Sequence, residues 1–579
     1  MVYLKEFEYS PDSSMDEIQR WPYGTNWPVV YIMHNDRDAY VGETLDAVRR
    51  TEQHQMETQL DGMRKICLIS GSRFNKSVIL DLEAFLIQYM QVDGKYHLLN
   101  GTNGIQKSDY YDKEEYEEDF SYIWRELIEM QIARNPLEAI SNKDSFKYSP
   151  YKTLTGEQMD GLVEIFRAIA QNISEPDPVH STILVEGEAG TGKTILAIYL
   201  VVFINQIIHK SFADQYLELD DIRKSAEIQS YMKKIKDLHK IGFVVPMQSL
   251  RTTVKDVFKE VQGLSEDMIL SPREVGKDIH HVGKYDLLIV DESHRLHRRK
   301  SLAQYPNFDA ISSSLNLGKD ATELDWILKR SKMQILFYDP SQSVRPSDIS
   351  REDFYNKTHF HLATAKPIKL KSQLRCLGGN DYINYVRDVL HCRAGLGKKH
   401  FQNYDLEFFD DIEAMSDKIK GLDRREKLCR LVAGYGWKWI SKNEKDPEHP
   451  KDYDIHIGDS HFIWNSTYTD WINSPNSLNE IGCIHTVQGY DLNYCGVIFG
   501  PEIEYDFGHH SIVIYKDHYF DSLGKAGTDE KGLKEYILNI YVTLMTRGIK
   551  GTYVYACNPG MQRYLKYYFS MDDEEKRRV

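Results

Sequence analysis

A glycine-rich turn between an apolar strand pattern and an apolar helix pattern constrains this chain more than any other feature. Residues 183–194 have the sequence Ile-Leu-Val-Glu-Gly-Glu-Ala-Gly-Thr-Gly-Lys-Thr. Such a turn points its backbone N–H groups at phosphate oxygens, at the positive end of the following helix. We therefore expect an α/β fold with a nucleoside triphosphate site, where Lys193 contacts the β- and γ-phosphates and Thr194 ligates Mg²⁺. The glycines of the turn are Gly187, Gly190 and Gly192.

Two further strand patterns end in polar side chains suited to the same site. Residues 285–290 are mostly apolar and lead into Asp291 and Glu292. We expect Asp291 to complete the Mg²⁺ shell with Thr194, and Glu292 to orient and deprotonate the attacking water. Residues 333–338 form the other strand pattern, and after it the Gln342 amide is placed to sense the γ-phosphate or its water.

Composition sets the outer bounds. The chain has 579 residues, a hydrophobic fraction of 41% and a net charge of −15, which fits several folded domains and excludes a uniformly basic nucleic-acid coat. The seven cysteines form no C-x-x-C pair, so we predict neither a disulfide framework nor a zinc ribbon. No apolar run is long enough to cross a membrane and no signal peptide is apparent, which predicts a cytoplasmic protein without a membrane partner.

The ordered motifs resemble those of superfamily 1 helicases, and their wording is most similar to the Schlafen-type helicase-like ATPases. The resemblance covers roughly residues 150 to 560 and implies two RecA-like lobes that bind ATP and Mg²⁺ in their cleft. It also implies that Arg375 and Arg547 neutralise charge on the γ-phosphoryl group. The remaining positions that it assigns to the nucleotide or nucleic acid are Gln158, 244–251, Gln488 and Gly489.

Two features weaken the expectation of strand separation. Gln488 stands where many members of the family carry lysine, so one cationic contact is lost and ATP hydrolysis is the firmer prediction. No aromatic ladder is evident. Trp464, Tyr468 and Trp471 could stack on bases, although core packing is the favoured interpretation.

The N-terminal region carries a second constellation. Strand patterns at 29–33 and 39–42 flank a polar turn and predict a hairpin. In the helix pattern that follows, Arg50 and His54 are four residues apart and share one face. A later apolar helix pattern carries Glu83, and a carboxylate in apolar company needs a partner such as a metal ion.

This region, about residues 26 to 105, resembles the GIY-YIG nuclease family. Val29-Val30 replaces the motif's Gly-Ile. The resemblance implies a phosphodiester-cleaving site with one Mg²⁺ or Mn²⁺ on Glu83, and Asn100 or Asn103 near the phosphate. The other positions that match the motif are Tyr31, Tyr40, Gly42, Arg50 and His54.

The resulting domain prediction is a small α/β nuclease-like domain (1–120), a helical linker (121–150), a first RecA-like lobe (151–365) and a second lobe with insertions (366–579). We interpret 401–449 and 508–531 as those insertions. The implied function is ATP-dependent nucleic-acid processing, with DNA favoured over RNA, in DNA repair or phage defence. Two alternatives stay open: an ATP-switched nuclease that does not unwind, and a nucleic-acid-binding ATPase whose nuclease domain is inactive. A homo-oligomer or a protein partner is also left open.

Overall fold

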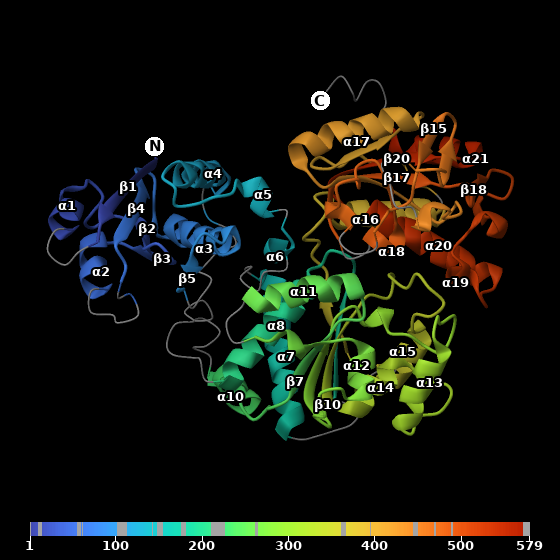
Figure 1. The fold of residues 1–579 in the computed structure, drawn as a ribbon, viewed down its shortest axis with the longest axis horizontal. Helices are drawn as coiled ribbons and strands as arrows, with labels where there is room; N and C mark the ends of the chain where they lie inside the picture. The colour runs from blue at the N-terminus through green and yellow to red at the C-terminus, as the bar shows by residue number, and fades with distance from the viewer. Residues whose placement is uncertain are drawn as a thin grey trace. The chain divides into compact units, whose positions relative to one another are not determined.

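Figure 1 shows the chain as a computed structural model with helices, parallel sheets and connecting loops. The structure describes residues 2–9, 14–54, 60, 62–100, 110, 113–141, 143–147, 154–174, 181–209, 226–260, 264–360, 366–393, 395, 397–443, 450–467, 471–487 and 490–570. Within these ranges, no helix has the length and apolar character needed to cross a lipid bilayer. The chain divides into two compact units. The first contains Met1–Ala170, Ile198–Asp237 and Glu260–Gly263, and the second contains Gln171–Ala197, Leu238–Lys259 and Leu264–Val579.

The first unit is built on a five-stranded sheet of order β1-β4-β2-β3-β5. The predicted hairpin is confirmed, because β2 and β3 pair antiparallel with Tyr31 opposite Gly42. The strands are β1 (Val2–Glu8), β2 (Val29–His34), β3 (Asp38–Thr44), β4 (Lys65–Gly71) and β5 (His97–Leu98). The helices before residue 100 are α1 (Ser14–Arg20), α2 (Ala47–His54) and α3 (Lys76–Asp93).

Alternating side chains of β2 supply two separate cores. Val30 and Ile32 face a core with α3, whereas Val29, Tyr31 and Met33 face a core that includes α2. Helix α3 begins at a well-formed cap, since the Asn75 side chain accepts hydrogen bonds from the next two free backbone N–H groups. The helices that follow add to the α3 core: α4 (Lys113–Glu129), α5 (Leu137–Ser141) and α6 (Asp144–Lys147).

The second unit contains a six-stranded parallel sheet of order β11-β6-β10-β9-β7-β8. The carboxyl ends of its strands meet at one edge, so the loops that follow them gather there. Its strands are β6 (Thr182–Gly187), β7 (Ile241–Val244), β8 (Ile269–Leu270), β9 (Tyr285–Val290), β10 (Ser331–Tyr338) and β11 (Ile368–Leu370). The helices along this part of the chain are α7 (Gly156–Ser174), α8 (Lys193–His209), α10 (Ala226–Ile235), α11 (Gln248–Glu260), α12 (Pro272–Lys277), α13 (Tyr305–Ser314), α14 (Glu323–Arg330) and α15 (Arg351–Lys357). Of these, α10 and most of α7 and α8 fall within the ranges of the first unit.

A second parallel sheet, of order β12-β20-β17-β13-β16, follows in the same unit. Helix α17 covers one face, and α16, α20 and α21 cover the other, because alternate strand residues join two different cores (Figure 1). The strands are β12 (Asp405–Phe408), β13 (Cys429–Ala433), β16 (Ile481–Cys483), β17 (Leu492–Phe499) and β20 (Gly548–Ala556). The helices are α16 (Gly379–Leu390), α17 (Ile412–Glu426), α18 (Ile484–Val487), α19 (Ser522–Lys525), α20 (Glu530–Met545) and α21 (Pro559–Phe569). Short hairpins are formed by β14 (Ile455–Ile457) with β15 (Ser460–Phe462) and by β18 (Ile503–Asp506) with β19 (Ser511–Ile514).

One sequence interpretation needs correction here. The segment 401–449 was expected to be an insertion, but its first part forms β12, α17 and β13, which belong to the second sheet and its covering layer. The two strands are only four and five residues long and flank a strongly charged helix, so their pattern resembles a surface segment. Core packing is confirmed for Trp464 and Trp471, which are fully buried. Tyr468 lies outside the described residues.

Candidate functional site

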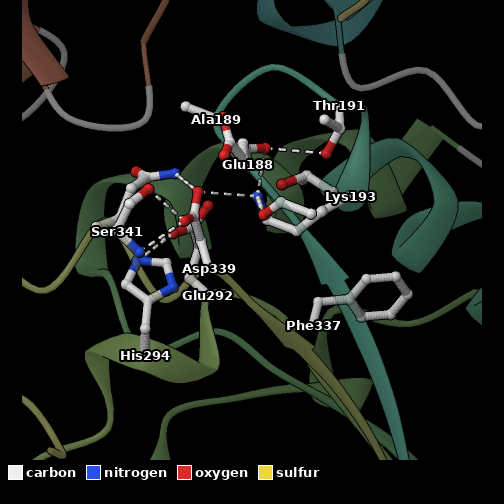
Figure 2. Close-up of polar contacts among 12 residues, drawn as sticks. Glu188, Ala189, Thr191, Lys193, Glu292, His294, Phe337, Asp339 and Ser341 are labelled. Carbon is white, nitrogen blue, oxygen red and sulfur yellow. Dashed lines mark hydrogen bonds and ion pairs between the residues drawn. The ribbon is translucent and has the colours of Figure 1, made fainter. Parts of the chain in front are cut away.

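The phosphate loop connects β6 to α8 at the carboxyl edge of the first parallel sheet. Gly190 and Gly192 have φ angles of 82° and 76°, a region that residues with a Cβ rarely adopt. The buried Lys193 side chain folds back on the loop: its Nζ donates to the carbonyl oxygens of Gly187 and Glu188, both at 2.8 Å. Nζ also lies 3.4 Å from Oδ2 of Asp339 (Figure 2). The loop therefore has the expected shape, and its lysine is held by oxygen acceptors.

Thr194 and Asp291 meet directly. The Thr194 hydroxyl donates to Asp291 Oδ2 at 2.7 Å. Asp291 is fully buried, and its other oxygen, Oδ1, makes no hydrogen bond to a described residue. A hydroxyl and a carboxylate with spare acceptor capacity fit Mg²⁺, which prefers oxygen ligands and usually keeps several waters. Among the described residues, no group of three or more His, Cys, Asp or Glu side chains could hold a metal ion, so phosphate and water would supply the remaining ligands.

Glu292 follows Asp291 in a left-handed backbone conformation, with φ 49° and ψ 41°. Its Oε2 lies 2.9 Å from Nε2 of the buried His294. Burial alone would raise the pKa of Glu292, but contact with His294 and the positive charges of Lys193 and Arg547 lower it on balance. The pKa of Asp291 is raised, first by burial and then by the Glu292 charge. The pKa values of these two neighbouring carboxyl groups are therefore shifted in opposite directions.

Asp339 organises the loop after β10. This buried carboxylate accepts hydrogen bonds from the backbone N–H and hydroxyl of Ser341, at 2.9 and 2.6 Å. It also accepts one from Gln342 Nε2 at 2.7 Å. Burial acts to raise the pKa of Asp339, yet Lys193 and these donors lower it overall. Sequence reasoning chose Gln342 here and missed Asp339 and His294. Both stand next to residues that it selected, at strand ends of one sheet edge, which is the signal that could have found them.

The segment after β11 of the first sheet, and helix α16 of the second sheet's covering layer, reach the same loop. Gln373 Nε2 donates to the Ala189 carbonyl at 2.7 Å, and the Leu374 N–H donates to the Gly190 carbonyl at 2.8 Å. A Cβ on Gly190 would stand 2.0 Å from Gln373 Oε1. On α16, the Arg387 guanidinium forms a double hydrogen bond with the Glu188 carboxylate, at 3.0 and 3.2 Å. Sequence reasoning missed this contact between loop and helix.

The two predicted arginines lie beside one short segment. Arg375 Nε is 2.6 Å from Oδ1 of Asp491. Arg547 is buried, and its Nη1 donates to the Tyr490 carbonyl at 3.2 Å. Gln488 and Gly489, which precede this segment, lie outside the described residues.

In the first unit, the predicted nuclease residues come together around one buried hydroxyl. Tyr31 Oη and His54 Nε2 are 2.7 Å apart, and Arg50 Nε donates to Tyr31 Oη at 3.3 Å. The rings of Tyr31 and Tyr40 lie 6.3 Å apart, and the Tyr40 and His54 rings 5.5 Å. A Cβ on Gly42 would stand 2.2 Å from Tyr31 Oη, so glycine is required for this packing.

Burial is the main reason that the Tyr31 hydroxyl stays protonated. Burial raises the pKa of Tyr31, Tyr40 raises it further, and Arg50 offsets part of the rise. The negative charge of Glu83 acts in the same direction as burial, so Glu83 belongs to the same electrostatic neighbourhood. Glu83 lies on α3, whereas Arg50 and His54 lie on α2.

The remaining predicted residues have local partners. The Asn100 side chain bridges the backbone of Val41, accepting from its N–H at 2.9 Å and donating to its carbonyl at 2.7 Å. Asn103 lies outside the described residues. Gln158 is buried near the start of α7, where its Oε1 accepts a hydrogen bond from the Thr155 N–H at 3.0 Å.

Comparison with known proteins extends these findings. Residues 180–558 match the Schlafen group 3, DNA/RNA helicase domain. Uncharacterized protein YPL245W of Saccharomyces cerevisiae is 25% identical over 474 residues, 75% of this chain and 94% of that protein. Among solved structures, arterivirus nonstructural protein 10 (helicase) is 12% identical with a TM-score of 0.24, and the match covers 69% of this chain and 64% of that chain. The Pif1 helicase from Bacteroides in complex with ADP-AlF3 and ssDNA is 12% identical with a TM-score of 0.25, covering 74% and 96%. The Pif1 helicase from Candida albicans is 11% identical with a TM-score of 0.27, covering 74% and 99%.

The parallel sheets, together with a phosphate loop that faces Asp291, define a helicase-like protein of the phosphate-loop class. The family match covers more than half of the sequence. The chain belongs to the Schlafen group 3 DNA/RNA helicase domain family.

Proposed function

We propose that this chain is an ATP-dependent nucleic-acid-processing protein whose two RecA-like lobes, 151–365 and 366–579, bind ATP between them. The contact that carries the proposal is the 2.7 Å hydrogen bond from Thr194 to Asp291, with Lys193 beside it at the same sheet edge. These are the side chains that a triphosphate with Mg²⁺ needs, and they come from segments far apart in the sequence.

The chain's own residues divide the work of hydrolysis. Lys193 exchanges its loop carbonyl acceptors for phosphate oxygens, which the flexible ammonium group can do without moving the backbone. Thr194 and Asp291 would hold Mg²⁺, which neutralises charge on the β- and γ-phosphates when bound. The Glu292 carboxylate accepts a proton from water, and its lowered pKa keeps it ionised for that purpose.

Arg375 and Arg547 supply positive charge from the second lobe. Arg375 exchanges its ion pair with Asp491 for a contact with the γ-phosphate. The buried Arg547 stabilises negative charge at Glu292, whose pKa it lowers. The family assignment supports DNA or RNA as the polymer on which this cycle acts. The preference for DNA, and a role in repair or defence, stay predictions.

A second activity is favoured by the cluster around Tyr31. We propose that residues 1–120 form a GIY-YIG nuclease domain, joined through the segment 121–150. Water gives a proton to Tyr31 Oη as the tyrosine passes its own proton to His54 Nε2, 2.7 Å away. Arg50 offsets charge that grows on the phosphate. Glu83 would hold Mg²⁺ or Mn²⁺, which polarises the phosphodiester when bound.

One experiment distinguishes three possibilities: an ATP-driven motor with a nuclease, an ATP-switched nuclease that does not unwind, and an ATPase whose nuclease domain is inactive. Wild type, Lys193→Ala and Glu83→Ala are incubated with labelled single- and double-stranded DNA and RNA, with and without ATP and Mg²⁺. We expect Lys193→Ala to lose ATP turnover and Glu83→Ala to lose cleavage only. Cleavage that needs ATP without strand displacement supports the switch, and unchanged cleavage by Glu83→Ala contradicts the nuclease assignment.

A further inference from the structure

The segment that follows β11 carries a glutamine whose side chain is bonded on both sides. Gln373 Nε2 donates to the Ala189 carbonyl of the phosphate loop at 2.7 Å. Its Oε1 accepts hydrogen bonds from the backbone N–H groups of Arg375 and Cys376, at 2.8 and 3.2 Å. One orientation of the amide satisfies all three partners, because a carbonyl needs a donor and the two N–H groups need an acceptor. Gln373 therefore joins the phosphate loop to the backbone of Arg375.

The loop and this segment are packed too closely to shift independently. A Cβ on Gly190 would stand 2.0 Å from Gln373 Oε1, so the glycine makes room for the amide. The Leu374 N–H donates to the Gly190 carbonyl at 2.8 Å. Two neighbouring residues of the segment thus hold two neighbouring residues of the loop, and a movement of Ala189 and Gly190 would displace the segment with them.

Arg375 has a long side chain whose reach depends on where its backbone is held. Its Nε lies 2.6 Å from Asp491 Oδ1, and its backbone N–H is held by Gln373. To reach a γ-phosphate the guanidinium must exchange its partner, whereas the backbone anchor can stay in place. A group misplaced by about 1 Å can cost about a hundredfold in rate, so the position of this anchor matters for hydrolysis.

We propose that Gln373 is a positioning residue for ATP hydrolysis, which makes the action of Arg375 depend on the conformation of the phosphate loop. Nε2 and Oε1 of Gln373 are both engaged with backbone groups, so the residue acts through Arg375. Lys193 Nζ donates to the two loop carbonyls just before Ala189, so its exchange of these acceptors for phosphate oxygens takes place beside the Gln373 contact. The proposal deepens the proposed function and rests on its assignment of Arg375 to the γ-phosphate.

The test is a double-mutant cycle of steady-state ATP turnover with Gln373→Ala, Arg375→Ala and the double variant. Gln373→Ala should lower kcat about a hundredfold, with a much smaller change in KM for ATP. In the Arg375→Ala background the same substitution should lower kcat by less than about threefold, because the residue through which it acts is gone. Asn380→Ala is the matched control and should match wild type, since this exposed amide donates to the Lys371 carbonyl of the same segment at 2.7 Å.

Two further measurements distinguish positioning from a general loss of structure. Gln373→Glu has the same size and keeps an acceptor for the Arg375 N–H, but it cannot donate to the Ala189 carbonyl. Its kcat should therefore fall nearly as far as that of Gln373→Ala. Binding of ADP with aluminium fluoride, a mimic of the transferring phosphoryl group, should be weakened by Gln373→Ala and by Arg375→Ala, while binding of AMP-PNP stays near the wild-type value.

The same variants show which assignment fails. Wild-type turnover that Gln373→Ala leaves unchanged, or equal losses from Gln373→Ala with and without Arg375, would overturn the positioning role and leave the proposed function intact. A wild-type kcat in Gln373→Glu would likewise overturn the link to the phosphate loop. A folded wild-type chain that neither turns over ATP nor binds AMP-PNP would overturn the proposed function, and the positioning role with it.

Discussion

Thr194 and Asp291, 97 residues apart in sequence, share a hydrogen bond of 2.7 Å in which the threonine hydroxyl donates. The bond joins the first turn of α8 to the end of β9 across the central strands of a parallel sheet. It pre-arranges two oxygen ligands before any ion arrives. Since a pre-arranged site loses less freedom on binding, this pair should set how much Mg²⁺ the reaction needs.

Replacing the hydroxyl tests that pair. Thr194→Ala removes one ligand and leaves the Asp291 carboxylate without its donor, so the Mg²⁺ concentration for half-maximal ATP turnover should rise about tenfold or more. Thr194→Ser keeps the hydroxyl and should behave nearly as wild type. A magnesium titration of turnover gives both values, and equal requirements in Thr194→Ala and wild type would exclude a ligand role.

We expect Arg375 to accelerate the hydrolysis of ATP. It is held 2.6 Å from Asp491, and an arginine that neutralises a transferring phosphoryl group contributes about 10³ to 10⁵ in rate. Arg375→Ala should therefore lower kcat by about a thousandfold with a smaller change in KM for ATP. Steady-state kinetics in parallel with Arg393→Ala, an exposed arginine paired with Asp388, control for loss of charge.

Gly42 should be essential for the nuclease site and irrelevant to ATP hydrolysis. A Cβ at this position would stand 2.2 Å from Tyr31 Oη, so Gly42→Ala must displace the hydroxyl from His54. We expect cleavage to fall at least as far as in Tyr31→Phe, with ATP turnover unchanged. Gly421→Ala is the control, because its Cβ would meet no atom within 4 Å. Full cleavage by Gly42→Ala would contradict the assigned geometry.

Glu502 should make stability depend on pH. Burial raises the pKa of this carboxyl to about 7, and the Tyr541 hydroxyl that donates to it at 2.5 Å offsets part of the rise. In the unfolded chain the Glu502 carboxyl ionises near pH 4.3. Between about pH 4.3 and pH 7 this carboxyl is therefore protonated in the folded state and ionised in the unfolded state. The contribution of Glu502 to the free energy of unfolding is fully present below this pH window and is lost as the pH rises through it. Above the window, the free energy of unfolding no longer changes with pH because of this group.

Glu502→Gln removes this dependence. Denaturant titrations from acid to mildly alkaline pH should give a flatter stability curve for the variant, with a gain of up to about 3 kcal/mol at alkaline pH. Glu504→Gln, a neighbouring surface carboxyl bonded to Tyr515, serves as the control. A curve for Glu502→Gln parallel to wild type across the window would show that the carboxyl is not protonated in the fold.

Much of this architecture is predictable because its signals are local. The strand, turn and helix of the phosphate loop lie within 183–194, and the β2–β3 hairpin needs only two strand patterns and a polar turn. Contacts over long separations leave no such pattern. Arg387 reaches Glu188 over 199 residues, and Lys193 reaches Asp339 over 146. Sequence spacing cannot identify these partners, since only the folded sheets bring them together.

The most direct test of the central claim is ATP turnover by the full chain with Mg²⁺, in wild type, Lys193→Ala and Asp291→Asn. We predict turnover in wild type, loss to background in Lys193→Ala, and a strong decrease in Asp291→Asn. Thermal unfolding of each variant confirms that the fold is intact. Turnover by Lys193→Ala equal to that of wild type, or a folded wild-type protein that neither binds nor hydrolyses ATP, would contradict the account.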